Sequence, residues 1–146
     1  MSLLDVLRKQ RNIKRWGNNF MIKPETVAEH AHYVAYMALK IGVEHPKEVK
    51  LETLLAKAIM HDSEEAVVGD ILYAFKGYDK DVDDFVDRTS EEIFMHYYGR
   101  TNPKTFKYYL EGKTIEDRVI KFCDYTEAYF NLIEDIRMGN QIVKPN

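Results

Sequence analysis

The chain has 146 residues, the length of one ordinary globular domain of ~100–200 residues. Hydrophobic residues make up 45% of it and charged residues 31%, a composition that argues against a disordered or fibrous protein. The net charge of −3 excludes a basic protein that coats nucleic acid through charge alone, and we expect no nucleic-acid partner. Cys123 is the only cysteine, so no disulfide can form within the chain and a reducing, cytoplasmic location is expected.

We expect neither a membrane segment nor a secretory signal. The longest apolar run, from Tyr33 to Val43, is interrupted by Lys40 and is shorter than the ~20 residues of a transmembrane helix. The first residues, Met-Ser-Leu-Leu-Asp, carry neither the basic region nor the long apolar region of a signal peptide.

Charge is distributed unevenly along the chain. Residues 1–23 contain six basic residues and one acidic residue, whereas residues 62–92 contain eleven acidic and three basic residues. Two interpretations stay open. In the first, both segments are simply solvated faces of the protein. In the second, the basic segment forms an edge that binds a small anion, beside an acidic segment that holds a cation.

Helical periodicity dominates the first part of the chain. Ser2 can cap a helix that runs to about Gln10, and the breakers in residues 11–25 indicate a loop. The sequence Thr26–Glu29 is a capping box, which opens a helix that we expect to end at Gly42.

The same periodicity continues to the end, and no alternating segment of strand length stands out. The later segments are, in order, a helix over 46–62, a short turn over 64–69, an amphipathic helix over 82–99, a short helix over 102–112 and a long helix over 114–138. The sequence therefore predicts an all-α fold of five to seven helices, organised as one domain over residues 1–146.

Four histidine and aspartate residues stand out on three of these helices. His61 and Asp62 end one helix, and side chains ~100° apart can flank a single point. His30 lies in a row with Val34 on the capped helix. Asp124 lies in an otherwise apolar row of the last helix, where a carboxylate is costly unless it is paired or binds a metal.

Each of these positions also has a plain structural interpretation. His30 can be a core histidine with satisfied hydrogen bonds, the His-Asp pair a helix cap, and Asp124 the partner of Lys121 or Arg118. Taken together, the four offer two imidazoles and two carboxylates from three helices. Such mixed nitrogen and oxygen ligands suit one divalent ion: manganese, iron, cobalt, nickel or zinc.

The order of motifs resembles that of the HD-domain phosphohydrolases. The motifs are Arg15-Trp16, Glu29-His30, His61-Asp62-Ser63-Glu64-Glu65, Gly69-Asp70 and Asp124, spread from about Arg15 to Glu134. The pattern is most similar to the YfbR-like 5′-deoxynucleotidases and to the related phage dATP triphosphohydrolases. Alarmone hydrolases of the wider family carry an aspartate where this chain has Ala66, which counts against that substrate.

The resemblance implies an HD-domain helical bundle and a role for each matching residue. His30, His61, Asp62 and Asp124 match the metal ligands, with magnesium added to the candidate ions. Glu65 and Asp62 match catalytic positions, and Glu65 is the acid near water and leaving group. The implied substrate contacts are Arg15 and Lys76 to phosphate, Trp16 to the nucleoside and Asp70 to a sugar hydroxyl. Lys23 is a further candidate for the phosphates.

Two classes of function follow, one enzymatic and one not. The first is a metal-dependent nucleotide phosphohydrolase that acts on deoxynucleoside 5′-monophosphates or, alternatively, releases triphosphate from deoxynucleoside triphosphates. The second is a catalytically silent module that senses a nucleotide. The intact ligand set with Glu65 favours the enzyme.

Aromatic residues surround more than one face of the last helix. The stripe consists of Phe122, Tyr125, Tyr129, Phe130 and Ile133. Part of it is expected in the core, and the surplus can serve a subunit contact in a homo-oligomer.

Overall fold

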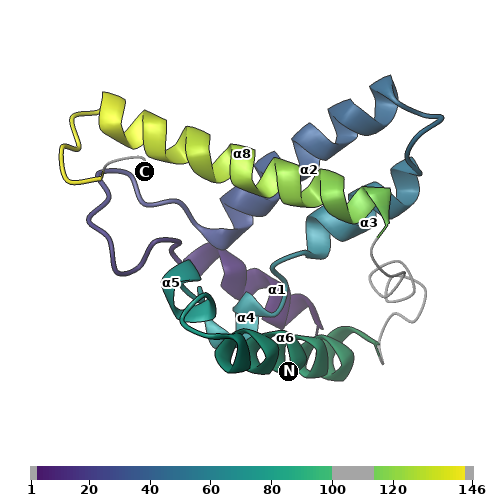
Figure 1. The fold of residues 1–146 in the computed structure, drawn as a ribbon, viewed down its shortest axis with the longest axis horizontal. Helices are drawn as coiled ribbons and strands as arrows, with labels where there is room; N and C mark the ends of the chain where they lie inside the picture. Colours follow the sequence, from purple (N-terminus) through teal and green to yellow (C-terminus); the bar gives the residue numbers. More distant parts are fainter. Residues whose placement is uncertain (1–2, 100–113, 144–146) are drawn as a thin grey trace.

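The structure is a computed structural model that describes residues 3–99 and 114–143, and its regular structure is helical (Figure 1). In chain order the elements are α1 (Leu3–Lys9), η1 (Gln10–Asn12), α2 (Val27–Glu44), α3 (Leu51–Met60), α4 (Glu65–Val68), α5 (Tyr73–Lys76), α6 (Lys80–Phe94), the π-turn η2 (Met95–Gly99) and α8 (Ile115–Arg137). Within these two ranges the β-type pairing is one isolated bridge, Lys14 to Thr26. The all-α prediction is confirmed. None of the helices described here has both the length and the apolar character of a transmembrane segment.

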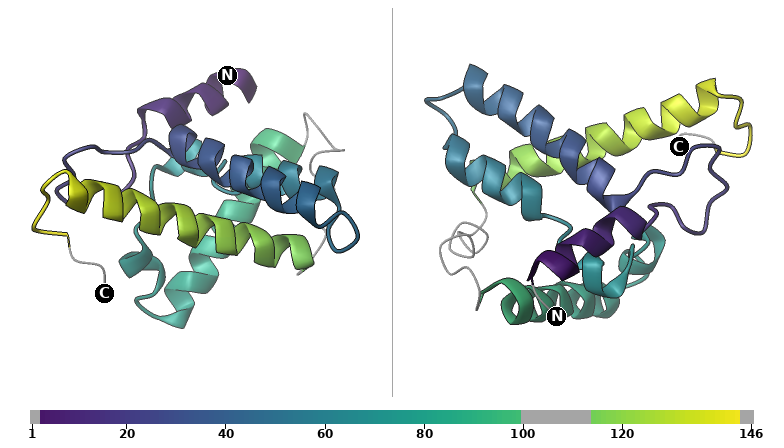
Figure 2. Two further views of the ribbon diagram at one scale, coloured as in Figure 1. Left: turned by 90° about the horizontal axis from the view of Figure 1, so that it is seen from above. Right: turned by 180° about the vertical axis from the view of Figure 1, so that it is seen from behind.

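Two separate apolar clusters organise these helices. The larger joins α2, α3 and α8, and its buried members are Val34, Ala38, Val49, Leu54, Ala58, Ile120 and Cys123. The smaller cluster joins α1, α4 and α6 through Val6, Ala66 and Phe94. Figure 2 shows α8 running beside α2 in one layer, with α1, α4 and α6 in another. Two described connections, residues 13–26 and 61–64, pass between the layers and carry part of the candidate site.

Gly42 does not end its helix as the sequence predicts. Helix α2 continues to Glu44, and Gly42 is buried against the start of α3. A Cβ atom at this position would lie 2.7 Å from Leu51 Cδ1 and 3.3 Å from Leu54 Cδ2. The glycine therefore serves the close approach of two helices, and the prediction that it ends the helix is wrong.

Other helix boundaries follow the sequence more closely. Both capping boxes are present, at Thr26 and at Thr114. Helix α3 begins at Leu51 rather than at Pro46, because residues 46–49 form turns before the Lys50 cap. The predicted Ser2 cap and the predicted helix over 102–112 lie outside the described residues.

The aromatic stripe of α8 is largely exposed. Tyr125 and Tyr129 are 53% and 54% exposed, and Phe122 and Phe130 are each 61% exposed. None of these four rings is therefore the part of the stripe that was expected in the core, and Cys123 and Ile120 supply the buried face instead.

A buried polar clamp holds the end of α8 to the loop before α2. Asp135, 1% exposed, accepts hydrogen bonds from the backbone N–H of Lys23 at 3.0 Å and from the Asn140 amide. Asn140 Nδ2 also donates to the Phe20 carbonyl at 2.8 Å, and its Oδ1 accepts from Ile142 N at 3.0 Å. Asn140 thus connects two segments that are distant in sequence.

We expect Asn140→Ala to lower the free energy of unfolding by about 1–3 kcal/mol, because Asp135 and the Phe20 carbonyl each lose a buried donor. Urea denaturation followed by far-UV circular dichroism measures the change. The exposed Asn12→Ala is the matched control and should stay within ~0.5 kcal/mol of wild type. Equal losses in both variants would contradict the clamp.

Candidate active site

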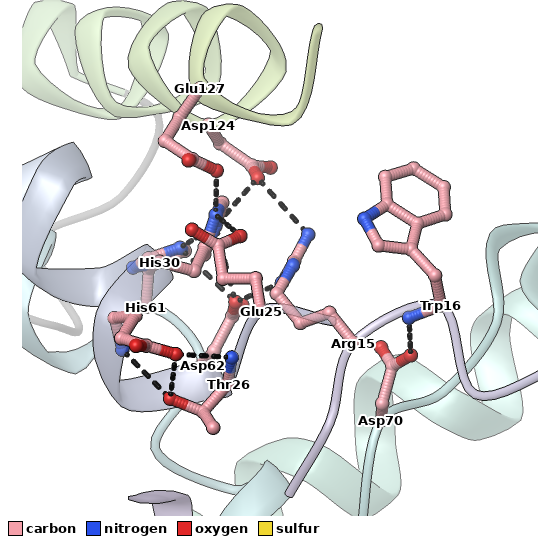
Figure 3. Close-up of polar contacts among 11 residues, drawn as sticks. Arg15, Trp16, Glu25, Thr26, His30, His61, Asp62, Asp70, Asp124 and Glu127 are labelled. Atoms are coloured by element: carbon pink, nitrogen blue, oxygen red, sulfur yellow. Dashed lines mark hydrogen bonds and ion pairs between the residues drawn. The ribbon is translucent and has the colours of Figure 1, made fainter. Parts of the chain in front are cut away.

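Four side chains from three helical segments converge between the layers (Figure 3). His30 comes from the first turn of α2, His61 and Asp62 follow α3, and Asp124 lies in the middle of α8. His30 Nε2 lies 3.2 Å from Asp124 Oδ1 and 3.6 Å from Asp62 Oδ2. The Nε2 atoms of His30 and His61 are 3.2 Å apart. The structure therefore brings together the four residues that were predicted as metal ligands.

Hydrogen bonds on the far side of each imidazole fix which nitrogen faces the centre. His61 Nδ1 lies 2.8 Å from the Ala58 carbonyl, which can only accept, so this nitrogen carries the proton. His30 Nδ1 donates in the same way to the Glu127 carboxylate. Both Nε2 lone pairs then point at one another when the rings are neutral, an arrangement that a proton or a metal ion at this point would stabilise.

The charged groups of the centre shift one another's pKa. Burial alone would lower the pKa of His30, but its bonds to Asp124 and Glu127 raise this pKa to about 9. Burial would raise the pKa of Asp62, yet the charge of His61, followed by that of Arg15, holds it well below its usual range. These shifts show that the imidazoles and carboxylates of the centre interact as opposite charges. Each of His30, His61 and Asp124 offers a ligand atom within 4.8 Å of the others. This donor set fits a divalent ion.

Arg15 lies over the two carboxylates from the 13–26 connection. Its Nη1 donates to Asp62 Oδ2 at 3.0 Å, and its Nη2 lies 4.0 Å from Asp124 Oδ1. Arg15 N also donates to the Glu25 carbonyl at 2.8 Å, which fixes the backbone at this point. The planar guanidinium is therefore held at the edge of the centre, where an anion would contact it.

A hydrogen bond joins the backbone of Trp16 to the side chain of Asp70. The backbone N–H of Trp16 donates to Asp70 Oδ2 at 2.9 Å. Trp16 has a φ of 61°, in the left-handed region that costs energy for residues other than glycine. Asp70 thus stabilises a strained turn that presents Trp16 and Arg15, a contact that the sequence did not indicate.

Glu64 and Glu65 are both buried, at 7% and 4% exposure. Burial, followed by the charge of Asp62, raises the pKa of Glu65 to about 9 and that of Glu64 to about 7. Among the described residues neither Oε2 has a hydrogen-bond partner. The turn after α3 therefore directs both side chains inward.

A cavity of about 420 Å³ opens beside the centre. Its lining includes His61, Asp62, Glu64, Lys76 and Asp124. Lys76 therefore lies in the wall of the cavity beside the centre, and its contact with phosphate stays a prediction.

The structure does not bring Lys23 to this cavity. Its Nζ pairs with Glu134 Oε1 at 3.4 Å, and it lines a different cavity of about 350 Å³. Lys23 belongs to the loop before α2 and contacts the C-terminal end of α8, whereas Asp124 lies in the middle of α8.

Sequence reasoning missed Glu25 and Glu127. Burial, followed by the charge of Glu127, raises the pKa of Glu25 to about 8. Glu127 lies three residues after Asp124, so both face one side of α8, and this spacing was the available signal.

Comparison with known proteins identifies the family. Residues 2–144 match the family described as 5′-deoxynucleotidase YfbR-like. The chain belongs to this family. A 5′-deoxynucleotidase of Vibrio vulnificus is 23% identical over 92% of this chain and 74% of its own length. The 4′-phosphooxetanocin A phosphatase of Priestia megaterium is 26% identical over 96% of this chain and 76% of its own.

Solved structures share the fold. A Listeria innocua HD-domain phosphohydrolase has a TM-score of 0.76 at 23% identity, covering 94% of this chain and 70% of its own. The HD phosphohydrolase of cyanophage S-2L, bound to dA and one catalytic Zn²⁺, has a TM-score of 0.69 at 19% identity over 88% and 69% of the two chains. The predicted resemblance is confirmed, as is the assignment to a family of hydrolases.

We expect Asp70→Ala to release the Trp16 turn, while Asp70→Asn keeps an acceptor oxygen for the Trp16 N–H. Trp16 is the only tryptophan, so acrylamide quenching of intrinsic fluorescence reports on this turn directly. The quenching constant should rise in the alanine variant and stay near wild type in the asparagine variant. Equal quenching in all three proteins would show that Asp70 does not hold the turn.

Proposed function

We propose that this protein is a metal-dependent 5′-deoxynucleotidase that hydrolyses deoxynucleoside 5′-monophosphates to deoxynucleoside and phosphate. The observation that carries the proposal is the convergence of His30, His61, Asp62 and Asp124 beside a cavity. Membership of the YfbR-like family and the presence of Arg15 and Glu65 at the same place support it. A nucleotide-sensing module without catalysis would need neither a buried protonated glutamate nor an intact ligand set.

We propose that these four residues hold one divalent ion. Their mixed nitrogen and oxygen atoms suit manganese, iron, cobalt, nickel or zinc better than magnesium, which prefers oxygen ligands. The single catalytic Zn²⁺ of the cyanophage enzyme supports the count of one. A bound ion neutralises phosphate charge and lowers the pKa of coordinated water from about 15.7 to about 7.

Residues of the chain then bind and orient the phosphate. The Arg15 guanidinium faces the centre with two terminal nitrogens and can bind two phosphate oxygens at once. Lys76 adds a point charge from the cavity wall. Together these cations hold the phosphorus in line with the attacking water.

Glu65 supplies the proton for the leaving group in this proposal. Its raised pKa keeps the carboxyl neutral at physiological pH, so it can donate a proton to the departing sugar oxygen O5′. Water adds to phosphorus as the P–O5′ bond breaks, and the sugar leaves as a neutral alcohol. The second carboxyl oxygen of Asp70 can accept from the sugar 3′-hydroxyl, and Trp16 forms a wall of the nucleoside site.

The charge of the cavity favours one phosphate over three. Three lysines line it, Lys57, Lys76 and Lys121, but Lys57 pairs with Asp117. Apart from this pair, the acidic side chains of Glu64, Asp87 and Glu91 line the same walls beside Asp62 and Asp124. A triphosphate brings about four negative charges, which this acidic lining would repel. Lys23, which was a candidate for further phosphates, lies at the other cavity.

We also propose that the chain forms one HD domain over residues 1–146 and works as a cytoplasmic homo-oligomer without nucleic acid. The family match over residues 2–144 supports a single domain. The exposed rings of Phe122, Tyr125, Tyr129 and Phe130 support a subunit contact on α8.

We expect the wild-type protein to release phosphate and deoxyadenosine from dAMP in the presence of manganese, cobalt or zinc. Chromatography of the products from dAMP, AMP and dATP measures the preference. The Asp124→Ala variant should lose both the ion and the activity, because it removes one of four ligands. Release of triphosphate from dATP, with dAMP untouched, would overturn the monophosphate assignment.

We expect Glu65→Gln to lower kcat by about 10²–10⁴-fold, because the amide cannot donate a proton to O5′. Metal content and KM for dAMP should stay near wild type, since Glu65 is not proposed as a ligand. The exposed Glu48→Gln is the control and should keep full activity. An unchanged kcat in Glu65→Gln would remove this residue from the chemical step.

A further inference from the structure

Two buried carboxylates face the side of His30 that points away from the proposed metal. His30 Nδ1 hydrogen-bonds Glu127 Oε2 on α8, and Glu25 Oε2 lies 3.8 Å from the same nitrogen (Figure 3). The side chains of His30, Glu127 and Glu25 are 0%, 8% and 5% exposed. Acidic side chains are rarely buried to this degree unless they have a specific partner. The partner of Glu127 is the His30 imidazole, and Glu25 lies beside both residues.

We propose that Glu127, supported by Glu25, is a positioning residue for the metal ligand His30. The inference rests on the proposed metal site and adds two residues to it. A hydrogen bond from Nδ1 to a fixed acceptor sets the tautomer and the rotation of the ring. The Nε2 lone pair is thereby directed at the point between Asp124 Oδ1 and His61 Nε2, each 3.2 Å away.

Glu127 is well placed for this task because it shares α8 with Asp124. The two residues are three positions apart on one face of the helix, so a single rigid element carries a ligand and the acceptor that orients another ligand. Any shift of α8 therefore moves Asp124 together with the acceptor of the His30 hydrogen bond.

Glu25 connects His30 to Arg15, the proposed phosphate contact. Its carbonyl accepts from Arg15 N at 2.8 Å, and the next residue, Thr26, caps the helix that carries His30. Its carboxylate lies beside His30 Nδ1. The residue thus links the backbone of Arg15 to the back of His30 through one short segment.

A second ion held by Glu25, His30 and Glu127 is the competing interpretation, since their ligand atoms also lie within 4.8 Å of one another. For that, His30 would have to bind one cation through each nitrogen, which requires loss of the proton from Nδ1. The hydrogen bond between Nδ1 and Glu127 favours a single ion instead.

The test measures metal affinity, which needs no nucleotide. Zn²⁺ is titrated into the apo-protein in competition with a chromogenic chelator, for wild type, Glu127→Leu and Glu127→Gln. We expect the leucine variant to bind Zn²⁺ about 10–100-fold more weakly and the glutamine variant to recover most of the loss, because its amide oxygen still accepts from Nδ1. The exposed Glu134→Gln, two turns further along α8, should bind as wild type.

Wild-type affinity in a folded Glu127→Leu, or two Zn²⁺ ions per wild-type chain, would overturn the inference. If the leucine variant does not fold, the glutamine variant decides. A Glu127→Gln protein with normal circular dichroism but a Zn²⁺ affinity well below that of wild type would show that His30 does not need only an acceptor oxygen, and would overturn the inference. Hydrolysis of dAMP by wild type is scored separately. Zn²⁺ binding without hydrolysis contradicts the proposed function alone, and unchanged Zn²⁺ binding in the variants contradicts this inference alone.

Discussion

Two imidazole nitrogens lie 3.2 Å apart with two carboxylates around them, and the buried polar structure of this protein depends on keeping them there. Such an arrangement is unfavourable unless a cation or a proton compensates it. The three helical segments that supply the groups are held by one apolar cluster, so hydrophobic packing supplies the free energy that polar repulsion opposes. The packing of the fold therefore stabilises the site against the repulsion between its own polar groups.

The helices could be predicted from local patterns, and the same patterns singled out the four candidate ligands, whose role stays a prediction. His30 and Asp124 interrupt apolar rows of their helices, and the Thr26 capping box marks the start of α2. Contacts between distant segments have no such signal. The burial of Glu64 is one example, because the tertiary arrangement determines which glutamates face inward.

Gly42 and Lys23 illustrate two different failures of local reasoning. A glycine near the end of a periodic segment ordinarily indicates a helix terminus, but here the contact with Leu51 determines the residue type. A lysine close to Arg15 in sequence was expected near the same phosphate, but the clamp of Asp135 and Asn140 ties that part of the loop to the end of α8. In both cases a tertiary contact outweighs the local preference.

The close approach at Gly42 affects the proposed metal ligands at the opposite end of α3. Leu51 begins this helix, and His61 and Asp62 follow its last residue. A helix of ten residues is about 15 Å long and moves as a rigid rod, so a displacement of Leu51 is transmitted to both ligands. The smallest side chain in the protein therefore sets the spacing of a centre that it never touches. A screen for loss of metal binding would find substitutions here, far from any coordinating atom.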